Sequence, residues 1–125
     1  MSITHLIYVA IGGALGAISR ALISHYIKGG FPWATFIVNV SGSLLIGLVL
    51  GWMGTRSQVP HGVKFLFATG FCGAFTTFST FSFETLTLFK EQSWEAGLAN
   101  IALNVILCIL AVWIGIRLAI QFSTP

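Results

Sequence analysis

The stretch at residues 69–84, T-G-F-C-G-A-F-T-T-F-S-T-F-S-F-E, decides the fold of this chain. It lies inside an apolar run, 63–89, that would form a helix of roughly 40 Å, whereas the hydrocarbon core of a bilayer is about 30 Å thick. Gly70 and Gly73 weaken a helix, and the hydroxyls of the threonines and serines that follow compete for backbone hydrogen bonds. The sequence therefore predicts a helix that is broken near residues 73–80.

A break at this depth leaves backbone N–H and C=O groups without helical hydrogen-bond partners. Unwound backbone inside a membrane is tolerated only where protein buries it or where it lines a wet cavity. The discontinuous helices of transporters use such segments, because their main-chain carbonyls can bind cations. The sequence therefore predicts carbonyl ligands for a cation in this stretch.

The phenylalanines of the stretch follow a second pattern. Phe71, Phe75 and Phe78 are spaced i, i+4, i+7, and Phe81 follows three residues later. The edge of an aromatic ring is weakly positive and can contact a small anion without holding it tightly. The same spacing is also typical of phenylalanines that fill a core. The hydroxyls between the rings favour a permeation path.

The composition of the whole chain is that of an integral membrane protein. Of its 125 residues, 56% are hydrophobic and 7% are charged. The N-terminal run has no basic region and no clear cleavage site, so we expect a retained first helix. The basic residues are scattered, so a nucleic-acid partner is not expected. The expected surroundings of the chain are the lipid bilayer. A single all-α domain, 1–125, is predicted, with four transmembrane helices at about 3–27, 33–53, 63–89 and 94–122.

Polar residues within these apolar segments each have two interpretations. Arg20 needs a partner or a wet cavity, unless its long side chain reaches the interface. The amide of Asn39 must find hydrogen bonds, either as a link between helices or as a pore-lining ligand. Asn100, Asn104 and Cys108 are spaced i, i+4, i+8 and form one weakly polar stripe that could face the third helix.

The charges flanking the four predicted helices are balanced. One side of the membrane would carry Arg56, Lys64 and Arg117, and the other Arg20, Lys28 and Lys90. The positive-inside rule then gives no preferred orientation. Because four short helices make a thin scaffold, we expect copies inserted both ways up to assemble as an antiparallel, dual-topology homodimer.

Three motifs resemble a known family. They read G-F-C-G-A-F-T-T-F-S-T-F-S-F-E at 70–84, G-G-A-L-G-A-I-S-R at 12–20 and T-F-I-V-N at 35–39. Together they are similar to the Fluc (CrcB-type) fluoride channels of microbes, and the resemblance covers essentially the whole chain. It implies a dual-topology homodimer in the inner or plasma membrane, with two separate fluoride pores and a structural sodium ion at the dimer centre. Its implied role is the passive export of cytoplasmic fluoride, which reduces the toxicity of the ion.

The resemblance also implies roles for individual residues. The sodium ligands would be the main-chain carbonyls of Gly73 and Thr76. The fluoride pore would be formed by Asn39, Phe78, Ser79, Thr80, Phe81 and Asn104. The vestibule would contain Arg20 and Glu84. The fourth helix of the family often has a polar track, which this chain interrupts with the apolar Val112.

Two other classes of function fit the sequence less well. An enzyme is not expected, because the three His, three acids and two Cys are dispersed without a nucleophile, base and orienting group. The stronger alternative is a small-multidrug-type exporter, which is also a four-helix dimer. Such an exporter would be expected to carry an acid deep in its first helix to exchange protons for cations. The first segment here has Arg20 and no acid.

Overall fold

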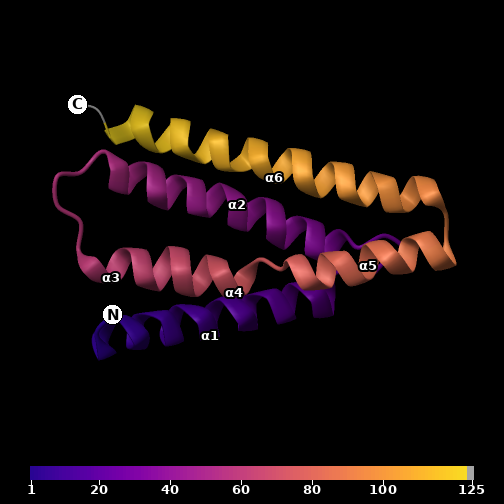
Figure 1. Ribbon diagram of the computed structural model, residues 1–125, viewed down its shortest axis with the longest axis horizontal. Coiled ribbons are helices and arrows are strands. Elements are labelled where there is room, and N and C mark those ends of the chain that lie inside the picture. The colour runs from indigo at the N-terminus through magenta and orange to yellow at the C-terminus, as the bar shows by residue number, and fades with distance from the viewer. Residues whose placement is uncertain (124–125) are drawn as a thin grey trace.

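The computed structural model describes residues 1–123, and all the regular structure in that range is helical (Figure 1). The predicted all-α class is therefore confirmed. Three long helices are α1 (Ile3–Tyr26), α2 (Trp33–Gly54) and α6 (Trp94–Ser123). Between α2 and α6 lies a third segment of four pieces, α3 (His61–Val63), the π-helical η1 (Lys64–Cys72), α4 (Gly73–Phe75) and α5 (Phe78–Glu91).

The helices run back and forth along one long axis. Each of α1, α2 and α6 is long and apolar enough to cross a membrane. The N-terminus, the loop between α2 and α3 and the end of α6 lie at one end of the molecule, and the other two connections lie at the opposite end (Figure 1). This is the arrangement of a multi-pass membrane protein with three candidate spans among residues 1–123, and the segment predicted as a further span, 63–89, is made of shorter pieces.

The third segment leaves helical geometry at two residues. Thr76 has φ −82° and ψ 159°, and Thr77 has φ −152° and ψ 122°, so both are extended. The hydroxyl of Thr77 accepts a hydrogen bond from the amide of Thr80 at 3.2 Å and so caps α5. The chain therefore passes from α4 to α5 through a short extended link.

Close backbone contact joins α1 to η1 and α4. A Cβ atom on Gly12 would collide with the carbonyl oxygen of Leu66, and one on Gly16 would collide with that of Phe71. The small-residue spacing of the first helix is thus used for close packing. The π-helical geometry of η1, which has i→i+5 hydrogen bonds, was not predicted from the sequence.

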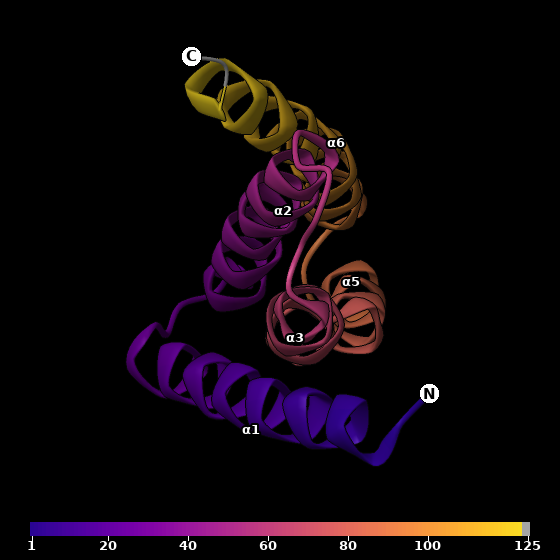
Figure 2. The ribbon, with the colours of Figure 1, turned by 90° about the vertical axis from the view of Figure 1, so that its left-hand side faces the viewer.

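Glycines also join α2 to α6. A Cβ atom on Gly47 would collide with the backbone of Val112, and one on Gly51 would lie 2.8 Å from the Cα atom of Ile116. On α6, Gly115 approaches α2 in the same way, with its added Cβ atom 2.8 Å from the amide nitrogen of Leu48. The end view shows α1 on one side, α2 and α6 on the other, and the third segment between them (Figure 2).

Candidate functional site

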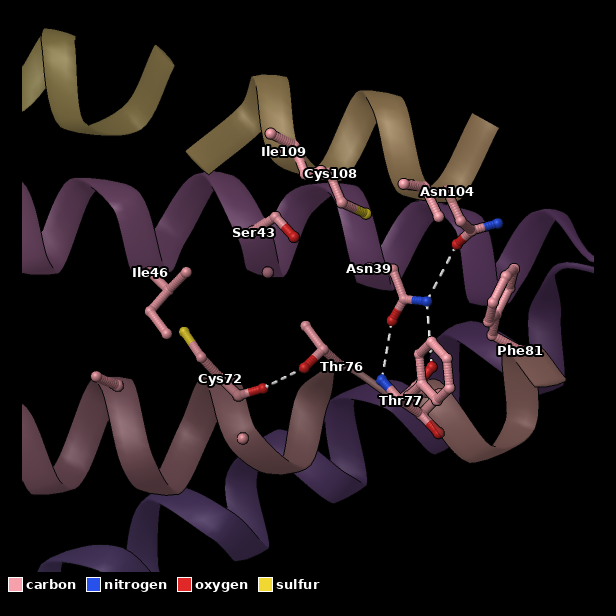
Figure 3. A pocket seen from close by; sticks show the side chains of 15 residues that line it. Asn39, Ser43, Ile46, Cys72, Thr76, Thr77, Phe81, Asn104, Cys108 and Ile109 are labelled. Atoms are coloured by element: carbon pink, nitrogen blue, oxygen red, sulfur yellow. Dashed lines mark hydrogen bonds between the residues drawn. The ribbon is translucent and has the colours of Figure 1, made fainter. Parts of the chain in front are cut away.

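A cavity of about 430 Å³ lies where α2, the third segment and α6 meet, beside the extended link (Figure 3). Every residue that lines it is uncharged. Amides, hydroxyls, thiols and aromatic rings alternate there with glycines and aliphatic side chains. The lining residues are Asn39, Gly42, Ser43, Ile46, Ala68, Cys72, Gly73, Thr76, Thr77, Phe78, Phe81, Asn104, Val105, Cys108 and Ile109.

The structure brings six of the ten predicted site residues to this cavity. They come from α2, from both sides of the extended link and from α6: Asn39, Gly73, Thr76, Phe78, Phe81 and Asn104. The four that do not line it are Arg20, Ser79, Thr80 and Glu84.

Asn39 holds the extended link in place. Its Oδ1 atom accepts a hydrogen bond from the amide of Thr77 at 2.8 Å, and its Nδ2 atom donates to the Thr77 carbonyl at 3.2 Å. The same Nδ2 atom donates to Oδ1 of Asn104 at 3.1 Å (Figure 3). Asn39 therefore links three segments and also lines the cavity, so the two interpretations of this residue are compatible.

The asparagine stripe of α6 continues this network away from the cavity. Asn104 donates from Nδ2 to both the carbonyl oxygen and Oδ1 of Asn100, each at 3.0 Å. Asn100 donates in turn to Oγ1 of Thr85 at 2.8 Å, and that hydroxyl donates to the carbonyl of Phe81 at 2.7 Å. All four of these residues are buried. Buried amides thus find the partners that their desolvation requires.

The extended link releases two main-chain carbonyls from helical hydrogen bonding. In a continuous α-helix the amides of Thr77 and Thr80 would donate to the carbonyls of Gly73 and Thr76. Here the Thr77 amide donates to Asn39, and the Thr80 amide donates to the hydroxyl of Thr77. Within residues 1–123 there is no cluster of His, Cys, Asp and Glu side chains that could hold a metal ion.

The two predicted pore phenylalanines lie next to each other on α5. Their ring centroids are 5.4 Å apart, with the planes tilted by 53°. Phe81 is 6% exposed, whereas Phe78 is 77% exposed. Phe71 and Phe75 form a separate stacked pair, with centroids 5.2 Å apart, and do not line the cavity. The ring of Phe81 is therefore fixed by packing, whereas the ring of Phe78 is exposed on the surface of the chain.

Ser79 and Thr80 belong to the first turn of α5. The hydroxyl of Thr77 lies 3.3 Å from that of Ser79 and donates to that of Thr80 at 3.2 Å. These hydroxyls form a small network at the helix start, and neither Ser79 nor Thr80 lines the cavity.

Arg20 and Glu84 lie outside the cavity, at separate places. The Nε atom of Arg20 donates to the carbonyl of Ala74 at 3.1 Å, so this arginine has a backbone partner beside the link. Glu84 accepts from the hydroxyl of Thr35 at 2.9 Å, and its other carboxylate oxygen is buried without a partner among the described residues. Glu84 lines a second hollow, of about 360 Å³, next to residues 29–32.

Three residues of the network were not predicted as site residues. Thr77 has a local signal, because threonine is among the residues preferred at the N-cap of a helix. Asn100 lies on the predicted polar stripe, but Thr85 has no signal in the sequence that separates it from other threonines of α5.

Comparison with known proteins gives a consistent result. A family model described as "CrcB-like protein, Camphor Resistance (CrcB)" matches residues 7–116. Three similar proteins are each named "Fluoride-specific ion channel FluC". The one from Campylobacter lari is 46% identical over 114 residues, 88% of this chain and 93% of the relative. The one from Shewanella loihica is 45% identical over 118 residues (91% and 94%), and that from Magnetococcus marinus is 43% identical over 113 residues (87% and 92%).

Proposed function

The chain belongs to the CrcB-like family, and we propose that it is a fluoride-specific ion channel through which cytoplasmic fluoride leaves the cell passively. It is a multi-pass membrane protein and not an enzyme. The observation that carries the proposal is the uncharged, largely apolar wall of the cavity beside the extended link, which includes the amides of Asn39 and Asn104 and the hydroxyls of Ser43, Thr76 and Thr77.

This wall suits the chemistry of a small, strongly hydrated anion. A path for fluoride must replace water with hydrogen-bond donors, and a fixed positive charge among them would trap the ion. Both amide hydrogens of Asn39 already have oxygen acceptors, on Thr77 and Asn104. A passing fluoride would accept a hydrogen bond from Asn39 Nδ2 in place of Asn104 Oδ1, so the acceptor is exchanged and the donor is not left unpaired. The ring edges of Phe78 and Phe81 provide weak contacts next to it.

We also propose how copies of the chain assemble. An antiparallel, dual-topology homodimer is supported by the weak charge asymmetry of the chain and by the exposure of Phe78. Because Arg20 bonds to the backbone beside the link, it adds little to the charge at the membrane surface. The remaining charges still give no strong preference for one orientation.

A structural sodium ion at the centre of that dimer is also proposed. Its ligands would be the released carbonyls of Gly73 and Thr76, and two-fold symmetry would double two ligands to four. Hard monovalent cations favour such oxygen ligands. An added Cβ atom on Gly73 would have the carbonyl of Ala68 as its nearest neighbour, at 3.9 Å, so the backbone there is open to a second copy.

The exporter alternative is not favoured by the structure. Residues 3–26, which form α1, contain no acidic residue that could exchange protons, and the relatives found carry the name of a channel.

Fluoride efflux from liposomes that contain the purified protein tests the function directly. We expect rapid loss of fluoride, measured with a fluoride electrode, and little loss of chloride from matched liposomes. Liposomes without protein give the background. Fluoride efflux at the background rate, or efflux that requires a proton gradient, would contradict a passive fluoride channel.

A further inference from the structure

We infer that Asn100 is a positioning residue, which sets the orientation of the Asn39 amide through Asn104 and thereby holds the Thr77 backbone beside the cavity. The role of Asn100 rests on the proposed function in one respect, because the cavity wall that it positions is taken to be the wall of a channel. The hydrogen bonds themselves do not depend on which ion passes.

The network between Asn39 and Phe81 has one direction. The amide nitrogen of each asparagine donates to the next residue, from Asn39 to Asn104, from Asn104 to Asn100 and from Asn100 to Thr85. The chain of donors ends where the Thr85 hydroxyl donates to a main-chain carbonyl, that of Phe81. Each member therefore presents an oxygen to the donor before it.

Direction matters because an asparagine amide can be turned over. Turning it exchanges a donor with an acceptor at nearly the same shape. If the Asn104 amide turned over, two NH2 groups would face each other at Asn39, and oxygen would face oxygen at Asn100. Since Asn100 is buried away from the cavity, the hydrogen bonds unmade there would not be replaced by water.

The orientation of Asn39 has a consequence for the extended link. Only with Oδ1 directed at the Thr77 amide, and Nδ2 at the Thr77 carbonyl, does Asn39 satisfy both groups. In the other orientation each of these backbone groups would meet a group of its own kind. The link would then lose the two bonds that tie it to α2.

Asn100 is placed to impose this orientation from a distance. It is 1% exposed, and it does not line the cavity. Its side chain and its carbonyl accept both hydrogen bonds that Asn104 donates. Its own orientation is set by Thr85, whose hydroxyl accepts at 2.8 Å while donating to the backbone. Asn100 therefore acts on the cavity wall only through Asn104 and Asn39.

Amide hydrogen exchange of the protein in lipid nanodiscs tests this assignment. The Thr77 amide reports on the orientation of Asn39. The Thr76 amide is the internal reference, because it donates to the carbonyl of Cys72 at 3.0 Å and not to Asn39. With Asn100→Leu we expect exchange at Thr77 to become about tenfold faster, and exchange at Thr76 to stay at the wild-type rate.

A matched pair at Thr85 separates hydrogen bonding from packing. Thr85→Val keeps the shape and removes the hydroxyl, so exchange at Thr77 should rise. Thr85→Ser keeps the hydroxyl and removes a methyl group, so exchange should match the wild type. If Asn100→Leu does not assemble, this pair alone decides, because both changes are small.

The outcomes divide clearly. Unchanged exchange at Thr77 in Thr85→Val and in an assembled Asn100→Leu protein would overturn the assignment, as would equal acceleration at Thr76 and Thr77. If Thr85→Ser accelerates amide exchange at Thr77 as much as Thr85→Val does, packing is responsible and the assignment fails. If the exchange pattern is as expected but the wild type conducts no fluoride, the proposed function fails and the positioning role of Asn100 remains.

Discussion

Asn39 on α2 holds the backbone of Thr77 by both of its polar groups, with the Thr77 amide 2.8 Å from Oδ1 and the Thr77 carbonyl 3.2 Å from Nδ2. A side-chain amide here replaces the hydrogen bonds that a neighbouring helical turn would supply. The extended link is therefore stabilised by a residue 38 positions away in the sequence.

Asn39→Asp is expected to abolish most fluoride efflux. The carboxylate can still accept from the Thr77 amide, but it has no hydrogen to donate to the Thr77 carbonyl or to Asn104. It also places a negative charge on the wall of the cavity. Efflux from liposomes should fall by about tenfold or more, because a hydrogen bond to a buried group is lost. Ser41→Ala is the control, since Ser41 is exposed on the same helix and donates to the carbonyl of Ile37. Wild-type efflux from Asn39→Asp would remove Asn39 from the path.

Phe81→Ile should reduce efflux while the protein still assembles. Isoleucine keeps much of the apolar bulk but has no ring edge to offer an anion. We expect a fall of about tenfold in fluoride efflux, which corresponds to about 1.4 kcal/mol in the barrier. Phe83→Ile is the matched control, because Phe83 lies on the same helix and is 73% exposed. If both variants conduct like the wild type, Phe81 only fills the core.

Gly12→Ala should destabilise the protein, and Gly13→Ala should not. A methyl group on Gly12 would meet the backbone of η1, which cannot move aside cheaply. The cost of such overpacking is about 1–3 kcal/mol. An added Cβ atom on Gly13 would have its nearest neighbour, the Gly70 carbonyl, at 4.0 Å. That variant should gain up to about 1 kcal/mol from the higher helix propensity of alanine. Unfolding in a detergent titration measures both, and equal stability of the two variants would refute close packing at Gly12.

Replacing sodium by the bulky cation N-methyl-D-glucamine should lower the melting temperature of the assembled protein. The reason is that an ion bound only by the folded state stabilises that state, by an amount that increases with the logarithm of its concentration above the Kd. Thr76→Ser should keep this response, because the ligand is a main-chain carbonyl and a serine hydroxyl can still donate to the carbonyl of Cys72 as the threonine does, at 2.8 Å. Identical melting of the wild type in the two cations would argue against a structural sodium ion.

Two lysines added to the loop between α2 and α3 should fix the orientation of every copy. Ser57 and Gln58 are exposed there, so Ser57→Lys with Gln58→Lys changes charge and little else. Expressed alone, this variant should lose efflux. A partner carrying Gly29→Lys and Gly30→Lys, at the opposite end, should restore it. The neutral pair Ser57→Asn and Gln58→Asn is the control. Normal efflux from the single-orientation variant would show that antiparallel assembly is wrong.

The overall architecture could be predicted from the sequence, because it depends on the length and composition of the apolar segments. Apolar segments with few charges must be helical in a membrane, since every backbone group has to be satisfied within the segment. The all-helical class and the multi-pass arrangement were predicted in this way and are confirmed. The family was predicted instead from the resemblance of three motifs, and the comparisons confirm it. The close contacts of Gly12 and Gly16 follow from a local spacing in the same sense.

The details of the site depend on contacts that no local pattern contains. Thr85 differs from Thr87 only by facing α6, and that depends on how α5 is rotated. Thr87 donates to the carbonyl of Phe83 at an exposed position, whereas Thr85 is buried against Asn100. The π-helical geometry of η1 is likewise a property of the packed segment. The sequence identifies the polar groups, but their hydrogen-bond partners are known only from the packed structure.

The extended link at residues 76 and 77 also changes the electrostatics of the third segment. A single long helix would have one positive and one negative end, both at the membrane surfaces. The link instead places the carbonyl end of α4 and the amide end of α5 in the interior, with opposite partial charges only two residues apart. Because these partial charges belong to the peptide groups, most side-chain substitutions would leave them in place. The chain thus has, at one depth, a negative pole suited to a cation and a positive pole suited to an anion.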